Sequence, residues 1–381
     1  MIILAAAIIL SLSNSGIISK ANKAKTDSDT ANLKEYVNTL RAEWELMTTA
    51  ERETCGSATF EDYANKKLEA NGYKGAVGVD GEIYSNLNEN AMAAIKAGIK
   101  VGDTVTGYEL DVATYTTSGE ENTYDPDIFS ETTPQPQTVT TNKDIIWKYL
   151  GVNANGEMEI MAVLSETDAI TDTTDKQLKV KLGGKGGYLK GPGMLNTICE
   201  KLYSKEGVGT ARSMNIDDVN SILGYTGEKG IYYDNNGKEV KTPTALRIGD
   251  IDSQLGTSLG TTTRTPDGRE LATYYVDYYY INKTSTDITN SDDETKSLVY
   301  NAKNTYWLAS PCVDADFNYS YSGAGFYVRY VSSTRVYAGF MSNSHDDTNC
   351  ATFAVRPVVK LDPSVKLVKD ATAANTWNIS K

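Results

Sequence analysis

The segment from Tyr306 to Val359 constrains the fold of this chain more than any other part of it. Two apolar blocks, Tyr306–Val313 and Ala354–Val359, frame a run that is rich in Tyr, Ser, Asn, Asp and Gly. These residue types favour strands and turns. Within the run, single apolar residues recur at Val328, Val331, Val336 and Met341. We therefore expect a β region whose core holds the two blocks and these apolar residues.

The polar residues of the same run are typical of an adaptable binding surface, because Tyr supplies contact area at little entropic cost. The alternative is an ordinary β surface, for which Tyr and Ser are equally suited. Converging acids and bases are largely missing, so we do not expect an enzyme. The candidate ligand-binding residues are Asp316, Asn318, Tyr319, Tyr321, Tyr327, Tyr330, Ser332, Arg335, Tyr337, Asn343, His345, Asp347 and Asn349.

The framing blocks belong to a longer series of short blocks. Ile145–Val152 followed by Glu157–Leu164 predicts a hairpin, and a central part follows from Gly187 to Cys199 and from Ala211 to Val219. In this order the blocks resemble a bacterial domain family of unknown function, related to C-type-lectin-like and formylglycine-generating-enzyme folds. Members often carry Arg where this chain has Pro311. The resemblance extends from Val101 to Leu367.

The resemblance implies an α+β fold, with a C-type-lectin-like domain of many short antiparallel strands and a few helices at 101–367. A small α+β connecting region would precede it at 51–100, and a C-terminal tail would follow at 368–381. The polar run also resembles the targets of diversity-generating retroelements, in which adenine-directed mutation enriches Asn, Tyr, Ser, Asp and Thr. The run would then form a variable recognition face.

The amino-terminal segment 1–50 combines an apolar run with a polar helix. Met1–Leu12 is apolar over about a dozen residues, whereas a membrane-spanning helix needs about 20. The helix carries one apolar stripe at Leu33, Val37, Leu40, Trp44 and Met47, which predicts packing against its own globular part. The arrangement resembles the latter half of a type IV pilin helix. We expect an in-frame upstream start to complete a membrane-length segment.

Charge narrows the range of partners. The formal net charge is -13, so a phosphate backbone would be repelled and nucleic acid is not an expected partner. The pilin-like segment instead implies a membrane or pilus as the anchor and an extracellular globular part. The expected ligand is an unknown protein or glycan at a cell surface. The resulting hypothesis is an adhesin-type surface protein; the alternative is a structural pilin-like subunit without a ligand.

Cysteine and histidine usage limits metal and redox chemistry. The chain has four cysteines, no Cys-x-x-Cys pair and one histidine, His345, which argues against a zinc site. No cofactor is expected. Cys199 and Cys312 lie in the blocks that carry the resemblance, so we favour a Cys199–Cys312 disulfide, with four buried free thiols as the alternative. A third hypothesis is a formylglycine-generating-type oxidase that holds copper with Cys312 and Cys350.

Three motifs suggest other chemistry, and each has a simpler interpretation. Gly183–Gly187 resembles a phosphate cradle but lacks the Lys-Ser/Thr ending of a P-loop, so we predict a loop before a helix. Asp234–Glu239 lacks the spacing of an EF-hand, so we predict a hairpin turn. His345–Asp347 has no nucleophile to support it, so we predict a surface loop.

Local signals predict several further elements. Thr59 and Asp62 begin a helix through Leu68 that Asn71-Gly72 ends. A second helix covers Met194–Tyr203, and a third, begun by Asn215, covers Ile216–Leu223. Tyr115–Thr141 is predicted to be a solvated loop. Hairpin turns are predicted at Asp80-Gly81, Asn155-Gly156, Asn236-Gly237 and Asp267-Gly268, and a strand at Thr273–Ile281.

Overall fold

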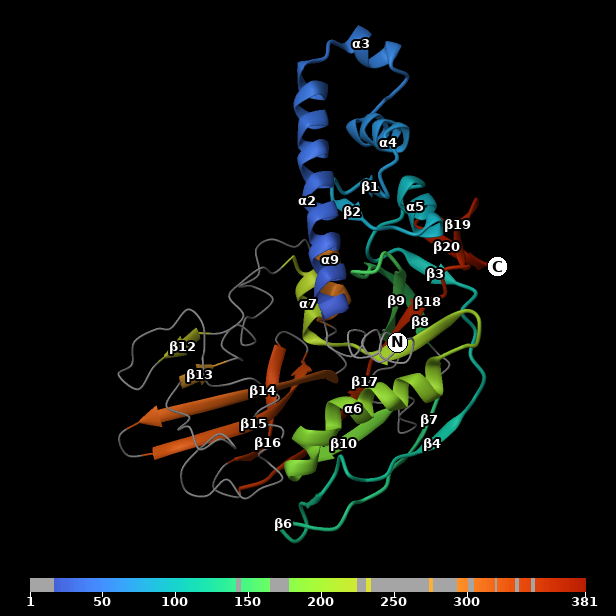
Figure 1. Cartoon of the computed structure of the whole chain (residues 1–381). Helices are drawn as coiled ribbons and strands as arrows, with labels where there is room; N and C mark the ends of the chain where they lie inside the picture. The colour runs from blue at the N-terminus through green and yellow to red at the C-terminus, as the bar shows by residue number, and fades with distance from the viewer. Residues whose placement is uncertain are drawn as a thin grey trace, which may run out of the picture. The chain divides into compact units, whose positions relative to one another are not determined.

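The computed structural model is a mixed α+β protein with many short strands and few helices, as the sequence predicts (Figure 1). It describes residues 17–141, 145–164, 178–224, 231–233, 274–276, 293–300, 305–318, 321–332, 336–343 and 347–381. The predicted turns at Asn236-Gly237 and Asp267-Gly268, the Asp234–Glu239 segment and the apolar run Met1–Leu12 lie outside these ranges. The predicted strand at Thr273–Ile281 is described only as β13 (Tyr274–Val276).

The chain forms two compact units. The first unit is drawn from Met1–Asp103, Gly151–Met158 and Pro363–Lys381, and the second from Thr104–Leu150 and Glu159–Asp362. Along the chain, the first unit passes to the second between Asp103 and Thr104. Residues 368–381, expected from the sequence to be a tail, are assigned to the first unit.

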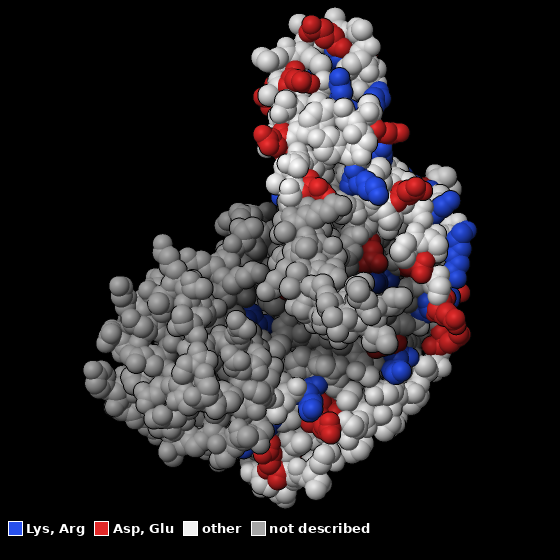
Figure 2. All heavy atoms as spheres, viewed as in Figure 1, with Lys and Arg blue, Asp and Glu red and all other residues white. Residues whose placement is uncertain are grey.

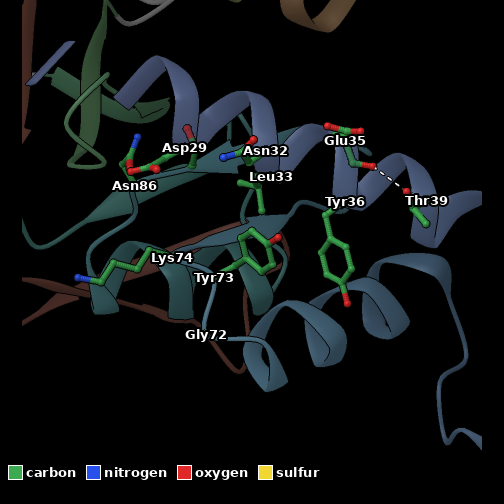
Figure 3. A pocket seen from close by; sticks show the side chains of 11 residues that line it. Asp29, Asn32, Leu33, Glu35, Tyr36, Thr39, Gly72, Tyr73, Lys74 and Asn86 are labelled. Carbon is green, nitrogen blue, oxygen red and sulfur yellow. Dashed lines mark hydrogen bonds between the residues drawn. The ribbon is translucent and has the colours of Figure 1, made fainter. Parts of the chain in front are cut away.

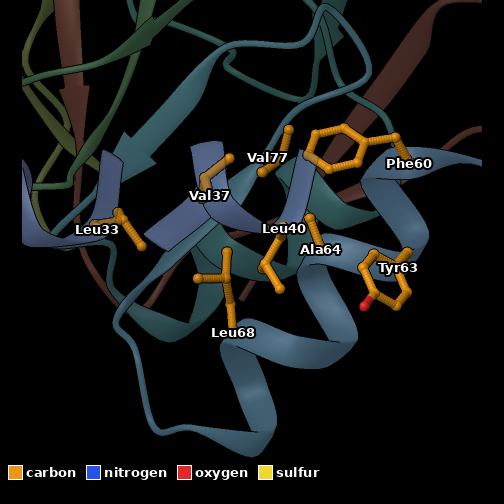
Figure 4. Close-up of a cluster of buried hydrophobic side chains, with 8 residues drawn as sticks. All are labelled: Leu33, Val37, Leu40, Phe60, Tyr63, Ala64, Leu68 and Val77. Atoms are coloured by element: carbon orange, nitrogen blue, oxygen red, sulfur yellow. The ribbon is translucent and has the colours of Figure 1, made fainter. Parts of the chain in front are cut away.

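The first unit is built on the long helix α2 (Ile17–Leu46). The apolar stripe is confirmed: Leu33, Val37 and Leu40 are buried, and Trp44 and Met47 pack at the edge of the same cluster. Figure 4 shows Leu33, Val37 and Leu40 in one cluster with Phe60, Tyr63, Ala64 and Leu68 of α4 (Phe60–Ala70). The stripe therefore serves the core of its own unit.

The local signals around α4 are confirmed. The Thr59 side chain accepts a hydrogen bond from the Asp62 N–H, and Asn71 ends the helix before Gly72 at φ +71°. The Asp80-Gly81 turn joins β1 (Gly75–Val77) to β2 (Ile83–Ser85), with Gly81 at φ +81°. The short helix α3 (Thr49–Thr54) begins with a capping box between Thr48 and Glu51.

The remainder of the first unit comes from α5 (Glu89–Lys96) and the carboxyl-terminal hairpin of β19 (Lys366–Lys369) and β20 (Thr376–Ser380). Asn88 caps α5 through a hydrogen bond to the Ala91 N–H. Trp377 of β20 is fully buried, and its Nε1 donates to Asp103 Oδ2 at 2.8 Å. Asp103 and Trp377, far apart in the sequence, thus meet within the first unit.

One sheet of the second unit has the strand order β11-β18-β9-β8-β3. The strands are β11 (Gly209–Ser213), β18 (Pro357–Leu361), β9 (Met158–Leu164), β8 (Ile145–Val152) and β3 (Thr104–Thr106). The predicted hairpin of Ile145–Val152 and Glu157–Leu164 is confirmed by β8 and β9, with Gly156 of its turn at φ +75°. Val358 and Val359 of the framing block are fully buried in β18, which lies between β11 and β9.

The other sheet has the order β10-β17-β14-β13-β12, with β15 paired to β14 and β16 to β15. Its strands are β10 (Lys179–Gly183), β17 (Cys350–Val355), β14 (Tyr306–Asn318), β13, β12 (Ile231–Tyr233), β15 (Tyr321–Val331) and β16 (Val336–Asn343). The predicted frame residues Trp307, Leu308 and Val355 are buried here, as are Val328, Val331, Val336 and Met341. The expectation for the core of this segment is confirmed.

Helix α6 (Gly184–Tyr203) contacts strands of both sheets. It corrects the sequence prediction, because the helix begins at Gly184 rather than Met194 and absorbs the expected glycine loop. Close packing explains the glycines: a Cβ on Gly186 would lie 2.1 Å from Glu120 O, and one on Gly187 would lie 2.7 Å from Met341 Sδ. The predicted third helix is confirmed as α7 (Ile216–Ile222), with a capping box between Asn215 and Asp218.

The Tyr115–Thr141 segment is more ordered than predicted. It contains β4 (Thr114–Thr116), β5 (Tyr124–Asp125), β6 (Ser130–Glu131) and β7 (Thr138–Thr140). Glu121 is fully buried and accepts hydrogen bonds from Thr117 Oγ1 and from Gln137 Nε2. The prediction of a solvated loop was wrong here. Hydrogen bonds between polar side chains of this segment stabilise it.

Charges of both signs alternate over the described part of the face drawn in Figure 2. Both kinds of charge are abundant in the chain, which has 50 acidic and 37 basic residues. Within the described ranges, every helix is too short or too polar to cross a membrane.

Candidate functional site

An aromatic row crosses four strands of the segment that contains the polar run. Trp307 of β14 lies opposite Tyr330 of β15, which lies opposite Tyr337 of β16. The Tyr330 and Tyr337 rings stack with centroids 5.5 Å apart and planes at 22°. Phe353 of β17 contacts both Trp307, at 4.5 Å, and Tyr330, at 4.6 Å. We call Trp307, Tyr330, Tyr337 and Phe353 the aromatic row.

Trp307 holds the row in place. It is fully buried, and its Nε1 donates to Val180 O in β10 at 2.9 Å. A Cβ on Gly339 would lie 3.1 Å from the indole, so glycine at this position lets β16 approach Trp307 closely. Tyr330, Tyr337 and Phe353 are only partly buried. The row therefore has a fixed inner end and a partly accessible outer part.

Tyr327 lies on the other side of the sheet from the row. Tyr327 and Tyr330 are three residues apart in regularly paired β15, and side chains alternate between faces along a strand. Tyr327 instead packs edge-on against Phe340, at 5.6 Å. The sequence hypothesis placed Tyr327 on one exposed face together with Tyr330 and Tyr337, whereas the strand pairing puts Tyr327 on the opposite face from these two.

Three other candidate residues, Asp316, Asn318 and Tyr321, lie at the end of the β14–β15 hairpin. Asp316 pairs with Gly323, and Asn318 pairs with Tyr321. Tyr319 falls between these strands, outside the described residues. The hairpin brings the backbones of Asp316, Asn318 and Tyr321 together, whereas their side-chain positions lie outside the description.

The remaining candidates lie elsewhere. Asp347 and Asn349 are exposed in the segment before β17, and Asn349 O accepts a hydrogen bond from Gly184 N at the start of α6. Ser332 is partly buried just after β15, and Asn343 ends β16. Arg335 and His345 lie outside the described residues. The structure thus places the described candidates in separate groups.

Burial shapes the acid–base character of the row. Burial and the neighbouring Tyr337 raise the pKa of Tyr330 above its usual range. Tyr330 is therefore neutral at physiological pH and offers a hydroxyl and a ring rather than a charge. Such a group suits hydrogen bonding and stacking. It does not suit general-base catalysis.

The cysteines do not form the predicted disulfide. Cys199 is a free, fully buried thiol in α6, so the Cys199–Cys312 bridge is absent from the structure. Burial raises the pKa of Cys199, against smaller lowering effects of Arg212 and Ser213. The thiol therefore behaves as a small core side chain.

The copper hypothesis rests on Cys312 and Cys350. Cys350 is a free, partly buried cysteine whose pKa is raised by burial. The side chain of Cys312 lies outside the described part of the chain. Among the residues whose positions are described, no cluster of His, Cys, Asp and Glu could hold a metal ion.

Sequence reasoning missed a buried arginine that joins the two framing blocks. Arg356 lies between β17 and β18, where the chain passes from one sheet to the other. Its Nη1 donates to the Tyr306 hydroxyl at 2.9 Å, its Nε to Ala162 O at 2.7 Å, and its Nη2 to Leu298 O. A charged residue inside an apolar block was the available signal. Arg356 fixes the frame around the aromatic row.

A second missed group is an ion cluster between β9, β11 and α7. Arg212 donates to both carboxylate oxygens of Asp218, at 2.6 and 2.8 Å, and to Glu159 at 3.0 Å. Desolvation acts to lower the pKa of Arg212, but the two carboxylates raise it overall. The Arg212 guanidinium and the carboxylates of Asp218 and Glu159 thus bind one another, so we interpret the cluster as structural.

Comparisons with known proteins add no assignment. No family model, curated protein or solved structure matches this chain.

Proposed function

We propose that this protein binds a ligand at a cell surface and that the aromatic row is its contact surface. In this proposal the second unit is a C-type-lectin-like domain, and α2 continues a pilin-like amino-terminal segment. The α+β architecture with many short strands supports the first part. The long α2 helix with its single apolar stripe supports the second.

One observation carries the binding proposal. Tyr330 and Tyr337 stack in register on neighbouring strands and are only partly buried, while the buried Trp307, bonded to Val180 O, packs edge-on against Tyr330. Pre-ordered tyrosines lose little entropy on binding and offer both a ring and a hydroxyl. Ligand contacts centred on such rings are common sites of high binding energy.

The test compares two tyrosines of the same sheet. Tyr337→Ala should weaken binding to immobilised host or bacterial surface extract by about 2 kcal/mol, and Tyr327→Ala, on the opposite face, should leave binding per folded molecule unchanged. Thermal unfolding of each variant corrects for folded fraction. Equal losses for the two variants, or losses that track the folded fraction alone, would contradict the row as a contact surface. Wild-type protein that binds no surface extract would favour a structural subunit.

A further inference from the structure

A polar groove in the first unit is separate from the aromatic row. It has a volume of about 930 Å³ and is formed by one face of α2, the Gly72–Lys74 segment and the end of β2 (Figure 3). Leu33 forms its apolar floor. A Cβ on Gly75 would lie 2.4 Å from Leu33 Cδ2, so glycine lets α2 approach β1 closely beneath the groove. Its size lies within the range of small-molecule sites.

Two stacked tyrosines line the groove. The rings of Tyr36 on α2 and Tyr73 before β1 lie 5.0 Å apart with planes at 14°. Asn71 Nδ2 donates to the Tyr36 hydroxyl at 2.9 Å and fixes that ring. Both rings pack at the edge of the first unit's apolar core. They offer a flat, rigid apolar surface with polar rims.

Polar side chains surround this surface on two walls. Asn32, Glu35 and Thr39 lie at helical spacing on the α2 wall, and residues three and four apart share one face of a helix. Ser85 and Asn86 form the other wall, where the Thr30 and Ser85 hydroxyls lie 2.9 Å apart. Amides donate and accept hydrogen bonds, whereas carboxylates accept them in pairs. This combination suits neighbouring hydroxyl groups on one ligand.

Charge and polarity argue against anionic and apolar ligands. The groove holds the carboxylates of Asp29 and Glu35 and one ammonium group, that of Lys74. An anion would be repelled by the excess of negative charge. An apolar ligand would leave the amides and carboxylates desolvated without partners. A neutral ligand with an apolar face and many hydroxyls satisfies both the tyrosine surface and the polar walls.

We propose that this groove binds a neutral oligosaccharide, which stacks on the Tyr36–Tyr73 pair and hydrogen-bonds to Asn32 and Glu35. The inference goes beyond the proposed function, because it gives the first unit a ligand site of its own. It does not depend on the aromatic row of the second unit.

The experiment titrates the full chain with mannotriose, chitotriose and maltotriose and follows binding by calorimetry and by NMR shifts of the Asn32 and Tyr73 amides. At least one trisaccharide should bind. Asn32→Ala should weaken binding about three- to tenfold, as expected for a lost hydrogen bond, and Tyr73→Ala should abolish it. Lys34→Ala, an exposed change on α2 outside the groove lining, is the matched control and should have no effect.

Two further variants identify the ligand class. Glu35→Gln keeps an acceptor without the charge, so trisaccharide binding should fall less than about threefold. Choline and inorganic phosphate serve as charged probes. The proposal is overturned if no trisaccharide binds, if binding survives Asn32→Ala and Tyr73→Ala, or if choline binds in a manner that Glu35→Gln abolishes. Tyr337→Ala should leave trisaccharide binding intact, which separates failure here from failure of the aromatic row.

Discussion

At the scale of single residues, Tyr63 connects the core of the first unit to pH. It is buried among α2 and α4 residues, and its hydroxyl donates to Glu43 Oε2 at 2.9 Å. Burial and this carboxylate raise the pKa of Tyr63 to about 12. Ionisation of the folded protein at this position therefore requires a higher pH than ionisation of the unfolded chain.

The raised pKa predicts alkaline destabilisation. Because an unfolded tyrosine titrates near pH 10, the stabilisation from Tyr63 is complete below about pH 10 and is lost as pH rises toward about 12. Tyr63→Phe removes this group, so the first unit of the variant should lose less stability over the same interval. Denaturant unfolding midpoints of both proteins, measured at several pH values across this interval, check this expectation. Parallel pH profiles would show that Tyr63 does not contribute.

At the same scale, residue patterns revealed caps and core positions but not close approaches. The helix caps at Thr59 and Asn215 and the apolar stripe of α2 could be predicted, because each depends on residues only three or four positions apart in the sequence. Gly184–Gly187 was misread as a loop, since its reason lies in Glu120 and Met341, which are distant in sequence. Arg356 was missed because its three acceptors come from three different elements.

At the scale of elements, the interior strand β18 provides a direct test of the frame. Val359 is fully buried and pairs with Ala211 of β11 and Ile160 of β9, which are buried and apolar. Val359→Asp would bury a charge with no partner in these pairs and should lower the free energy of unfolding by about 3–5 kcal/mol. Val358 is a weaker test, because it lies opposite Arg212.

Thr210→Asp, at an exposed position of β11, is the control for this change, since it introduces the same side chain beside Lys360. Its effect should stay within about 0.5 kcal/mol. Denaturant unfolding of the two variants measures the difference. Equal stability of Val359→Asp and the parent would contradict the placement of the Ala354–Val359 block in the core.

Pairing between elements also explains why the predicted recognition face was divided. The polar run was read as one surface, but it folds into β14, β15, β16 and the segment before β17. A register shift between Phe326 and Tyr327 and another between Trp307 and Pro311 set which side chains share a face. A one-residue change of register moves a side chain to the other face. The amino-acid composition of the polar run does not predict where such register shifts occur.

At the scale of the whole molecule, the two units differ in how the chain builds them. The first unit combines the amino-terminal helices with Gly151–Met158 and with Pro363–Lys381, so its core is completed by the last part of the sequence. No periodicity in the sequence predicts such a return. The predicted tail at 368–381 reflects this, because a short strand pair at a chain end carries little local signal of its partners.

The return of the chain yields a final prediction. Removal of Pro363–Lys381 takes away Trp377, which is fully buried and bonded to Asp103. Loss of a buried Trp alone costs about 3–5 kcal/mol, so the first unit should open. Hydrogen exchange should then accelerate in α4 and α5, while β11, β18 and β9 of the second unit keep their protection. Trp377→Ala in the full chain should show the same pattern more weakly, because the rest of the hairpin remains. Uniform loss of protection in both units would mean that they unfold as one, and that the carboxyl-terminal hairpin stabilises the molecule as a whole.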